Sequence, residues 1–205
     1  MDNWLPWRDY HDDLALTRLV KVGGVLRSVW QRVSELHEPG AGDNLWSLSC
    51  RAFSRSGYEL SRARKDWSWL SIVEQRRMQW ILALGVIPVR FYHGDSLDVP
   101  DRYSTPTEIE KVIQQGLLNL DERIQPGVLL RFVTETNAGG IPTSVKLIEY
   151  DEASNEVLNV FTIPEAEAGG GTVKQFPQSA PKPGVLQPKP AARPLTGRAK
   201  PETEE

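Results

Sequence analysis

Apolar residues recur at alternating steps of three and four between residues 12 and 38, at Leu19, Val22, Leu26, Val29, Val33 and Leu36. This spacing places them on one face of a helix and predicts a helix with one buried stripe. Gly23 and Gly24 interrupt the stripe and predict a kink or break, because each costs about 1 kcal/mol relative to alanine. Residues 44–64 fit a strand or a helix, and the N-cap residue Asn44 favours a helix.

The stretch "RARKDWSWLSIVEQRRMQW", residues 62–80, predicts a helix that starts after Asp66, covers residues 67–84 and stops at Gly85. On a helical wheel its apolar residues, including Trp67 and Trp80, fall along one arc. Arg77 lies near the middle of that arc. A buried guanidinium needs a carboxylate inside the fold or an anion from another molecule. We expect an internal pair, with Glu74 as one candidate.

The next segment, "VIPVRFYH", alternates like a strand, and Pro88 predicts an edge strand because it lacks an amide donor. "TPTE", residues 105–108, is typical of a capping box before a helix. The apolar face of this helix is expected at Ile109, Val112, Ile113, Gly116, Leu117 and Leu120. Residues 128–136, 144–151 and 157–163 then predict a β-meander, because connections this short favour antiparallel neighbours.

These elements predict one α+β domain over residues 1–164, helical from 11 to 84 and strand–helix–meander from 86 to 163. We expect N-terminal helices on one face of a small, mainly antiparallel sheet of three or four strands. After Pro164 the chain is rich in Pro, Gly, Lys and Ala. Residues 165–205 are therefore predicted to be a disordered tail, because such a segment cannot bury enough apolar surface to offset its ordering entropy.

The 205-residue chain has a formal net charge of −3 and one cysteine. The charge argues against nucleic-acid or membrane binding through bulk electrostatics, and the lone cysteine excludes an internal disulfide. The start of the sequence lacks the basic and apolar regions of a signal peptide, and no apolar run is long enough to span a bilayer. We expect a cytoplasmic protein without cofactors, with another protein as its partner and no membrane association.

The first candidate site is the basic and tryptophan-rich patch between residues 62 and 77, formed by Arg62, Arg64, Lys65, Trp69, Arg76 and Arg77. A local cluster of cations beside an aromatic ring is one arrangement that binds nucleic acid. The same residues also fit a solvated helix surface, which leaves nucleic-acid binding as an alternative hypothesis.

Two further candidate sites are weaker. Arg90, Tyr92 and Arg131 would share an exposed polar face if helices covered only one side of the sheet, although any half-solvated sheet shows such alternation. A loop carries the possible metal ligands His93, Asp95, Asp98 and Asp101. Their spacing matches neither the calcium-loop pattern nor a zincin motif, and aspartate is also a common turn residue. We expect no metal there.

No catalytic arrangement is apparent in the sequence. Cys50 has no base nearby in the chain, no nucleotide-binding glycine motif occurs, and Glu135, Lys146 and Glu149 lack the spacing of a metal nuclease. The leading hypothesis is a non-catalytic protein-interaction module or accessory subunit. Nucleic-acid binding through residues 62–77 is the alternative, and a metal-dependent hydrolase comes third.

Overall fold

The computed structural model describes residues 4–76, 79–118 and 121–165. The helices are α1 (Pro6–Asp9), α2 (Leu16–Glu35), α3 (Leu45–Ala63), α4 (Asp101–Ser104) and α5 (Glu108–Leu118), with short 3-10 helices at Asp12–Leu14 and Pro39–Ala41. The strands are β1 (Leu70–Arg76), β2 (Gln79–Leu84), β3 (Ile87–His93), β4 (Val128–Thr136), β5 (Pro142–Asp151) and β6 (Glu156–Thr162). Apart from Glu165, the predicted tail lies outside the described residues.

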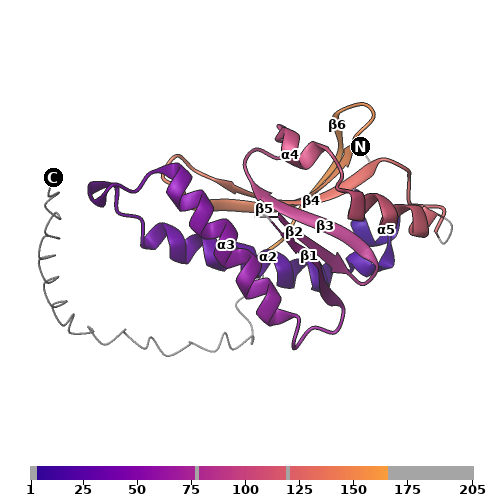
Figure 1. Cartoon of the computed structure of the whole chain (residues 1–205), viewed down its shortest axis with the longest axis horizontal. Coiled ribbons are helices and arrows are strands. Elements are labelled where there is room, and N and C mark those ends of the chain that lie inside the picture. Colours follow the sequence, from indigo (N-terminus) through magenta and orange to yellow (C-terminus); the bar gives the residue numbers. More distant parts are fainter. Residues whose placement is uncertain (1–3, 77–78, 119–120, 166–205) are drawn as a thin grey trace, which may run out of the picture. The chain divides into compact units, whose positions relative to one another are not determined.

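The strands form one six-stranded sheet in chain order, β1 to β6 (Figure 1). Neighbours are antiparallel except β3 and β4, which run parallel and are joined through α4 and α5. The α+β class is confirmed, and the predicted meander is present as β4, β5 and β6. The expected sheet of three or four strands is wrong, because β1 and β2 add to it. No helix in the described ranges is long and apolar enough to cross a membrane.

The predicted helix over residues 67–84 is wrong, because this segment forms the antiparallel strands β1 and β2. From Trp80 to Leu84 every residue of β2 is buried, since the strand lies between two others and is covered on its faces. A continuous apolar run of this kind does not show the alternation of a half-buried strand and resembles a buried helix in sequence. Arg77 lies outside the described residues, so its expected internal ion pair stays a prediction.

The two long helices agree better with the sequence. α2 is continuous through Gly23 and Gly24, so the helix does not break there. A Cβ atom at Gly23 would stand 2.9 Å from the Ile163 side chain, so the missing side chain there allows close packing. The preference for a helix over residues 44–64 is confirmed. Asn44 caps α3 by accepting a hydrogen bond from the Ser47 amide at 2.9 Å.

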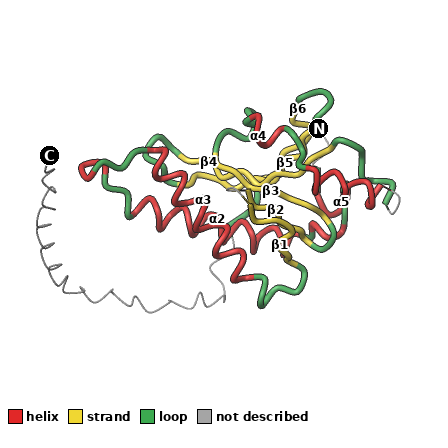
Figure 2. The backbone as a smooth tube through the Cα atoms, viewed as in Figure 1, coloured by secondary structure: helices red, strands yellow, loops and turns green. Residues whose placement is uncertain are grey.

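The main hydrophobic core lies between one face of the sheet and the N-terminal helices. α2 packs against β4 and β5, and α3 packs against β1 and β3 (Figure 2). Leu19, Val22 and Leu26 from α2 meet Val89 and Phe132 from the sheet, and all five are essentially inaccessible to solvent. The first half of the stripe predicted from the sequence therefore covers the sheet. Val29 and Val33 pack instead against Leu48 and Ala52 of α3, and Leu36, also expected in the stripe, is exposed.

The opposite face of the sheet is covered too, which corrects the expectation of helices on one face. α4 and α5 lie over β3 and β4 on this side, where buried charged groups contact them directly. The capping box of α5 is shifted by two residues from the prediction. Thr107 and Glu110 exchange the hydrogen bonds, with the Glu110 carboxylate accepting from the Thr107 amide at 2.9 Å. Val112, expected on the apolar face, is exposed.

Pro88 does not mark an edge strand, because β3 lies between β2 and β4 in the interior of the sheet. It pairs with Ala83 of β2 on one side. On the other side the ladder with β4 starts one residue later, at Val89. The missing amide is therefore accommodated at the start of the strand, where the parallel ladder does not yet need a donor.

Candidate functional site

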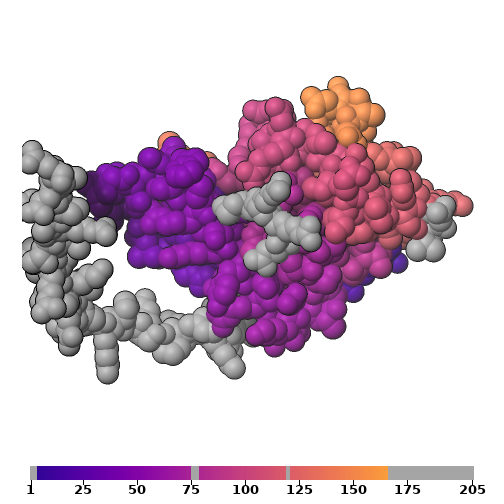
Figure 3. Space-filling model, in the orientation of Figure 1, coloured from indigo at the N-terminus to yellow at the C-terminus, as the bar shows by residue number. Residues whose placement is uncertain are grey.

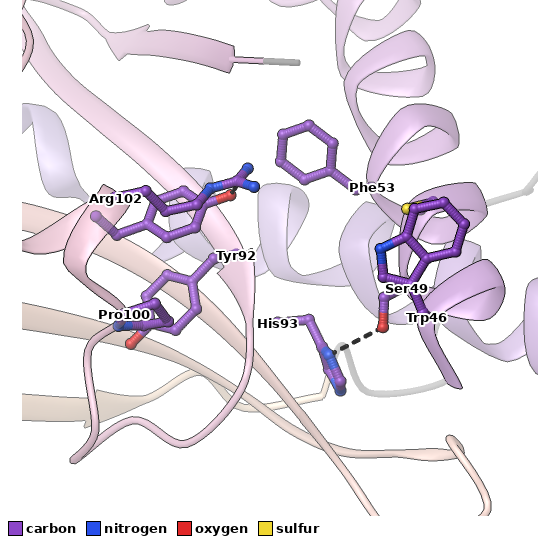
Figure 4. Close-up of a pocket in the computed structure, with 9 residues that line it drawn as sticks. Trp46, Ser49, Phe53, Tyr92, His93, Pro100 and Arg102 are labelled. Atoms are coloured by element: carbon purple, nitrogen blue, oxygen red, sulfur yellow. Dashed lines mark hydrogen bonds between the residues drawn. The ribbon is translucent and has the colours of Figure 1, made fainter. Parts of the chain in front are cut away.

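A cavity of about 280 Å³ lies between α3 and the segment that leads from β3 into α4 (Figure 4). α3 contributes Trp46, Ser49, Cys50 and Phe53, β3 contributes Tyr92 and His93, and the α4 region contributes Pro100, Arg102 and Tyr103. The α3 residues are spaced three, one and three positions apart, which places them on one helical face. We call this cavity the α3–α4 pocket.

The pocket lies beyond the paired residues of β2 and β3 in the described part of the chain. β2 pairs with β3 only from Ile87 to Arg90, so residues 91–93 extend past the described ladder. α3 packs against this part of β3, and the loop to α4 leaves from its carboxyl end. Figure 3 shows the surface of α3 in purple and that of the α4–α5 region in pink. Loops at strand ends often carry binding residues because a rigid sheet positions them.

Aromatic rings dominate the walls of the pocket. Trp46 is 75% exposed, while Tyr92 and Tyr103 are buried and stack with their ring centroids 4.8 Å apart. Phe53 is half-buried and packs against Phe91 at 5.0 Å. Figure 4 shows Trp46 and Ser49 on the helix side and Tyr92, Pro100 and Arg102 on the other. The pocket therefore presents rigid apolar surface with one large ring left in solvent.

Arg102 is the charged side chain of the pocket. Its guanidinium carbon lies 4.6 Å from the centroid of the Tyr103 ring and 5.7 Å from that of Phe53. One Nη2–H group donates to the Tyr103 hydroxyl at 2.6 Å. The side chain is exposed, and no carboxylate in the described part of the chain lies within ion-pair distance of it. It is therefore a cation held by aromatic rings rather than by an acid.

His93 links the pocket to the core. Its ring packs against Trp30 with centroids 4.3 Å apart and the ring planes tilted by 31°, and its Nε2 lies 2.9 Å from the Thr136 hydroxyl. Burial lowers the pKa of His93, so the neutral ring is favoured. Nδ1 lies 3.4 Å from the Ser49 hydroxyl, but that hydroxyl donates to the Leu45 carbonyl at 2.8 Å. His93 is therefore not placed to take the Ser49 proton, and this pair is not an activated nucleophile.

A buried charge cluster lies behind the tyrosine wall. Glu110 sits between two arginines, 2.7 Å from Arg131 Nη1 and 3.5 Å from Arg90 Nη1, and all three side chains are about 99% buried or more. Arg131 Nε donates to the Tyr103 carbonyl at 2.9 Å, and Arg90 donates to the Arg102 carbonyl at 2.7 Å. The cluster therefore fixes the backbone of α4, and with it the residues that line the pocket.

The charge of this cluster is not balanced by its own members, which are two guanidinium groups and one carboxylate. Burial lowers the pKa of both arginines, and Glu110 opposes that shift. Arg131 Nη2 is buried without a hydrogen-bond acceptor among the described residues. The neighbouring Tyr92 and Tyr103 have pKa values raised mainly by burial, so their hydroxyl groups stay protonated at neutral pH.

A second polar cluster joins the β3–α4 loop to the sheet. Lys146 Nζ donates to Glu135 at 2.8 Å and to the Ser96 hydroxyl at 3.1 Å. The hydrogen bonds from Lys146, Ser96 and Ser144 outweigh burial and lower the pKa of Glu135 to about 2. Lys146 Nζ is the donor in both hydrogen bonds, so it is not placed to act as a base for Ser96. This cluster positions the loop.

The basic patch predicted over residues 62–77 is only partly placed by the structure. Arg62 lies 3.7 Å from Glu59, and its guanidinium is 5.9 Å from the Tyr58 ring. Arg64 and Lys65 are exposed just after α3, without a carboxylate partner among the described residues. The Arg76 side chain and all of Arg77 lie outside the described residues.

Trp69, the aromatic member of that patch, stacks on Trp67 with centroids 5.1 Å apart. The Arg18 guanidinium lies 5.6 Å from the Trp69 ring, and Lys21 Nζ lies 5.7 Å from the Trp67 ring. Both rings also pack against the hydrophobic core and are half-buried. Among the described residues, the cations over these two rings therefore come from α2, which lies outside the predicted patch.

The structure does not support the other two candidate sites, which were the polar sheet face and the metal loop. Arg90, Tyr92 and Arg131 are at most 3% exposed, so they form no open platform. In the predicted metal loop, His93 contacts Ser49 and Thr136, while Asp95 accepts from the Leu97 amide at 2.8 Å. No group of three or more His, Cys, Asp or Glu residues in the described ranges, which include Asp98 and Asp101, could hold a metal ion.

Sequence reasoning missed most of the pocket. Trp46, Ser49 and Phe53 give a usable signal only once residues 44–64 are assigned to a helix, because the shared face then follows from their spacing. Arg102 and Tyr103 follow the loop proposed for metal binding and show no pattern of their own in the sequence. No protein-family model, curated protein or solved structure shows significant similarity to this chain.

Proposed function

We propose that this protein is a non-catalytic protein-interaction module that holds a segment of its partner in the α3–α4 pocket. The observation that carries the proposal is the exposure of Trp46, three-quarters open to solvent beside a cavity with walls of Phe53, Tyr92 and Tyr103. Interfaces derive much of their binding free energy from a few tryptophan, tyrosine and arginine residues around well-packed pockets.

The size of the pocket supports a macromolecular partner. Sites for drug-sized ligands and cofactors usually enclose about 300–1,000 Å³. A cavity of about 280 Å³ falls just below that range. It suits one large side chain of a partner, with Trp46 folding over the inserted group. Leu97 of the β3–α4 loop is a further exposed apolar side chain, 73% accessible, although it does not line the cavity.

Capture of partners from a lysate of the native cells tests the proposal. Immobilised wild type is compared with Trp46→Ser and with Tyr58→Ser as a matched control. Tyr58 is also an exposed aromatic residue of α3, 60% accessible, but it does not line the pocket. We expect the partner to be lost with Trp46→Ser and kept with Tyr58→Ser. Equal capture by both variants would contradict the proposal.

Nucleic-acid binding is a second candidate, favoured by the stacked rings of Trp67 and Trp69 with Lys21 over the Trp67 ring. Arg64 and Lys65 are exposed just before these tryptophans in the sequence. Single-stranded nucleic acids bind to aromatic platforms flanked by cations, with strong dependence on salt. The half-buried state of both rings reduces the surface available for bases, which is why this candidate ranks second.

Salt dependence separates the two candidates. Binding through phosphate contacts falls steeply as salt rises and weakens in an Arg64→Gln, Lys65→Gln double variant. Binding through the aromatic pocket changes little with salt and is unaffected by that double variant. Fluorescence anisotropy with a labelled single-stranded oligonucleotide provides the measurement for the second candidate.

A further inference from the structure

We propose that the α3–α4 pocket recognises an acidic peptide segment in which a carboxylate side chain lies next to a large apolar residue, with Arg102 binding the carboxylate. This inference rests on the proposed function, because it specifies the chemistry of the partner segment. The apolar residue would enter the cavity between Trp46 and the tyrosine wall, and the acidic side chain would meet Arg102.

The first argument is the way Arg102 is held. Phe53 and Tyr103 contact the guanidinium as cation–π partners, and the Tyr103 hydroxyl accepts one of its hydrogen bonds. Arginine has five N–H donors arranged in a rigid fork that matches a carboxylate. The other donors of Arg102 have no acceptor among the described residues. A guanidinium positioned by rings with donors still available is preorganised for an incoming carboxylate.

The second argument is charge complementarity. Arg90 and Arg131 next to the pocket pair with Glu110, so they are not available to a ligand. Arg55, Arg64 and Arg102 have no carboxylate within ion-pair distance in the described part of the chain. Of these three only Arg102 lines the pocket, and no acidic residue lines it. A partner segment can therefore supply the carboxylate that would pair with Arg102.

The third argument concerns the distance over which the pocket attracts an acidic group. The loop before Arg102 carries the exposed residues Asp98 and Asp101, which do not line the pocket but lower the electrostatic potential around it. Long-range attraction therefore gives an acidic segment little advantage. The preference must come from direct hydrogen bonds to the guanidinium, which are shorter and stronger when both groups are charged. It should persist at about 1 M salt, where the Debye length is only about 3 Å.

Isothermal titration calorimetry with end-blocked peptides tests the inference. The probes are acetyl-Ala-Phe-Asp-Ala-amide, its Asn analogue of nearly equal shape, and acetyl-Ala-Ala-Asp-Ala-amide, which lacks the apolar anchor. We expect wild type to bind the Phe-Asp peptide about tenfold more tightly than the Phe-Asn peptide, and the Ala-Asp peptide more weakly still. The ratio should fall to about one in Arg102→Gln and stay near ten in Arg55→Gln, which changes an exposed arginine of α3 outside the pocket.

The possible outcomes separate this inference from the proposed function. Equal binding of the Phe-Asp and Phe-Asn peptides by wild type overturns the acidic preference, while capture that still depends on Trp46 leaves the pocket as the partner site. If Trp46→Ser binds the Phe-Asp peptide with the affinity of wild type, the peptide binds outside the pocket. That result would contradict both the proposed function and the acidic preference. Acetyl-Ala-Phe with a free C-terminal carboxylate is a further probe. If it binds more tightly than the Phe-Asp peptide, the carboxylate that Arg102 binds belongs to a chain terminus, and the proposal of an acidic side chain is overturned. A melting curve confirms that Arg102→Gln is folded.

Discussion

The two faces of the sheet are held by different interactions. On one face, α2 and α3 cover the strands with a continuous apolar core that includes Leu19, Leu26 and Phe132. On the other face, buried charged groups hold α4 and α5 against the sheet. Arg131 forms an ion pair with Glu110 of α5 and donates a hydrogen bond to the backbone of α4. An apolar core tolerates many arrangements of similar volume, whereas buried charges need defined partners. The charged face therefore fixes the position of α4, and the pocket depends on that position.

The largest effect is expected from Glu110→Gln, because it leaves two buried guanidinium groups without a counter-charge. Loss of one partner from a buried ion pair costs about 3–5 kcal/mol of unfolding free energy. Glu108→Gln on the same helix is the control, since that side chain is 92% exposed and its ion pair among the described residues is with Lys111. Urea unfolding followed by circular dichroism measures both. A similar small loss in the two variants would show that the cluster does not hold α5.

Leu26→Ala tests the apolar face and should cost about 2–5 kcal/mol, the usual range for a buried leucine. A loss of stability on the two faces should have different effects on peptide binding. Leu26→Ala should lower stability without moving α4, so the peptide affinity of the remaining folded protein stays unchanged. Glu110→Gln should weaken peptide binding even where the protein is folded. Calorimetry at a temperature where both variants are folded measures their affinities for the Phe-Asp peptide. Equal affinities would show that the charge cluster does not control the pocket.

Arg131→Met sharpens the account of the charge cluster. It removes the buried Nη2 group that has no described acceptor and leaves one guanidinium for one carboxylate. It also removes the hydrogen bond to the Tyr103 carbonyl. Because an unsatisfied buried group costs about 1–3 kcal/mol, its removal offsets part of the loss, and we expect a smaller destabilisation than in Glu110→Gln. The reverse order in urea unfolding would contradict a cluster with excess positive charge.

The smallest effect concerns Glu135, which ties the β3–α4 loop to Lys146 at the margin of the charged face. Its pKa is about 2 in the folded protein, below the ordinary value of 4.5. A lowered folded pKa stabilises the protein above the unfolded pKa, and this contribution is lost as the pH falls from about 4.5 to about 2. Thermal melts should therefore show a shallower loss of stability over this range in Glu135→Gln. The same slope as wild type would show that the pair contributes nothing.

The apolar face could be read from the sequence and the charged face could not. The spacing of Leu19, Val22 and Leu26 identifies the buried side of α2, because a helix on a sheet hides one stripe. The interior strand β2 hides both of its sides, so its apolar run resembled a helix. Arg90 and Arg131 alternate with apolar residues as surface residues do. Only the crossover through α4 and α5 buries them, and that crossover depends on the parallel pairing of β3 with β4.

The pocket was missed because it is assembled from separate segments. Trp46 and Phe53 lie on α3, while Arg102 follows a loop after β3. No single stretch of the sequence contains the cation and the rings that hold it. The basic patch predicted at residues 62–77 drew attention because its charges are adjacent in sequence. Adjacent charges are common on solvated helices, whereas a cation held between rings from two elements appears only in the fold.

The most direct measurement of the central claim is the rate at which Cys50 is alkylated in the presence and absence of the captured partner. Cys50 is the single cysteine of the chain and lines the α3–α4 pocket, so alkylation of this chain, followed by mass spectrometry, reports on the pocket alone. If the partner occupies the pocket, alkylation by iodoacetamide should slow about tenfold or more in the complex. Addition of the partner to Trp46→Ser should have no effect. An unchanged rate in a complex shown to be saturated would contradict the assignment of this pocket as the partner site.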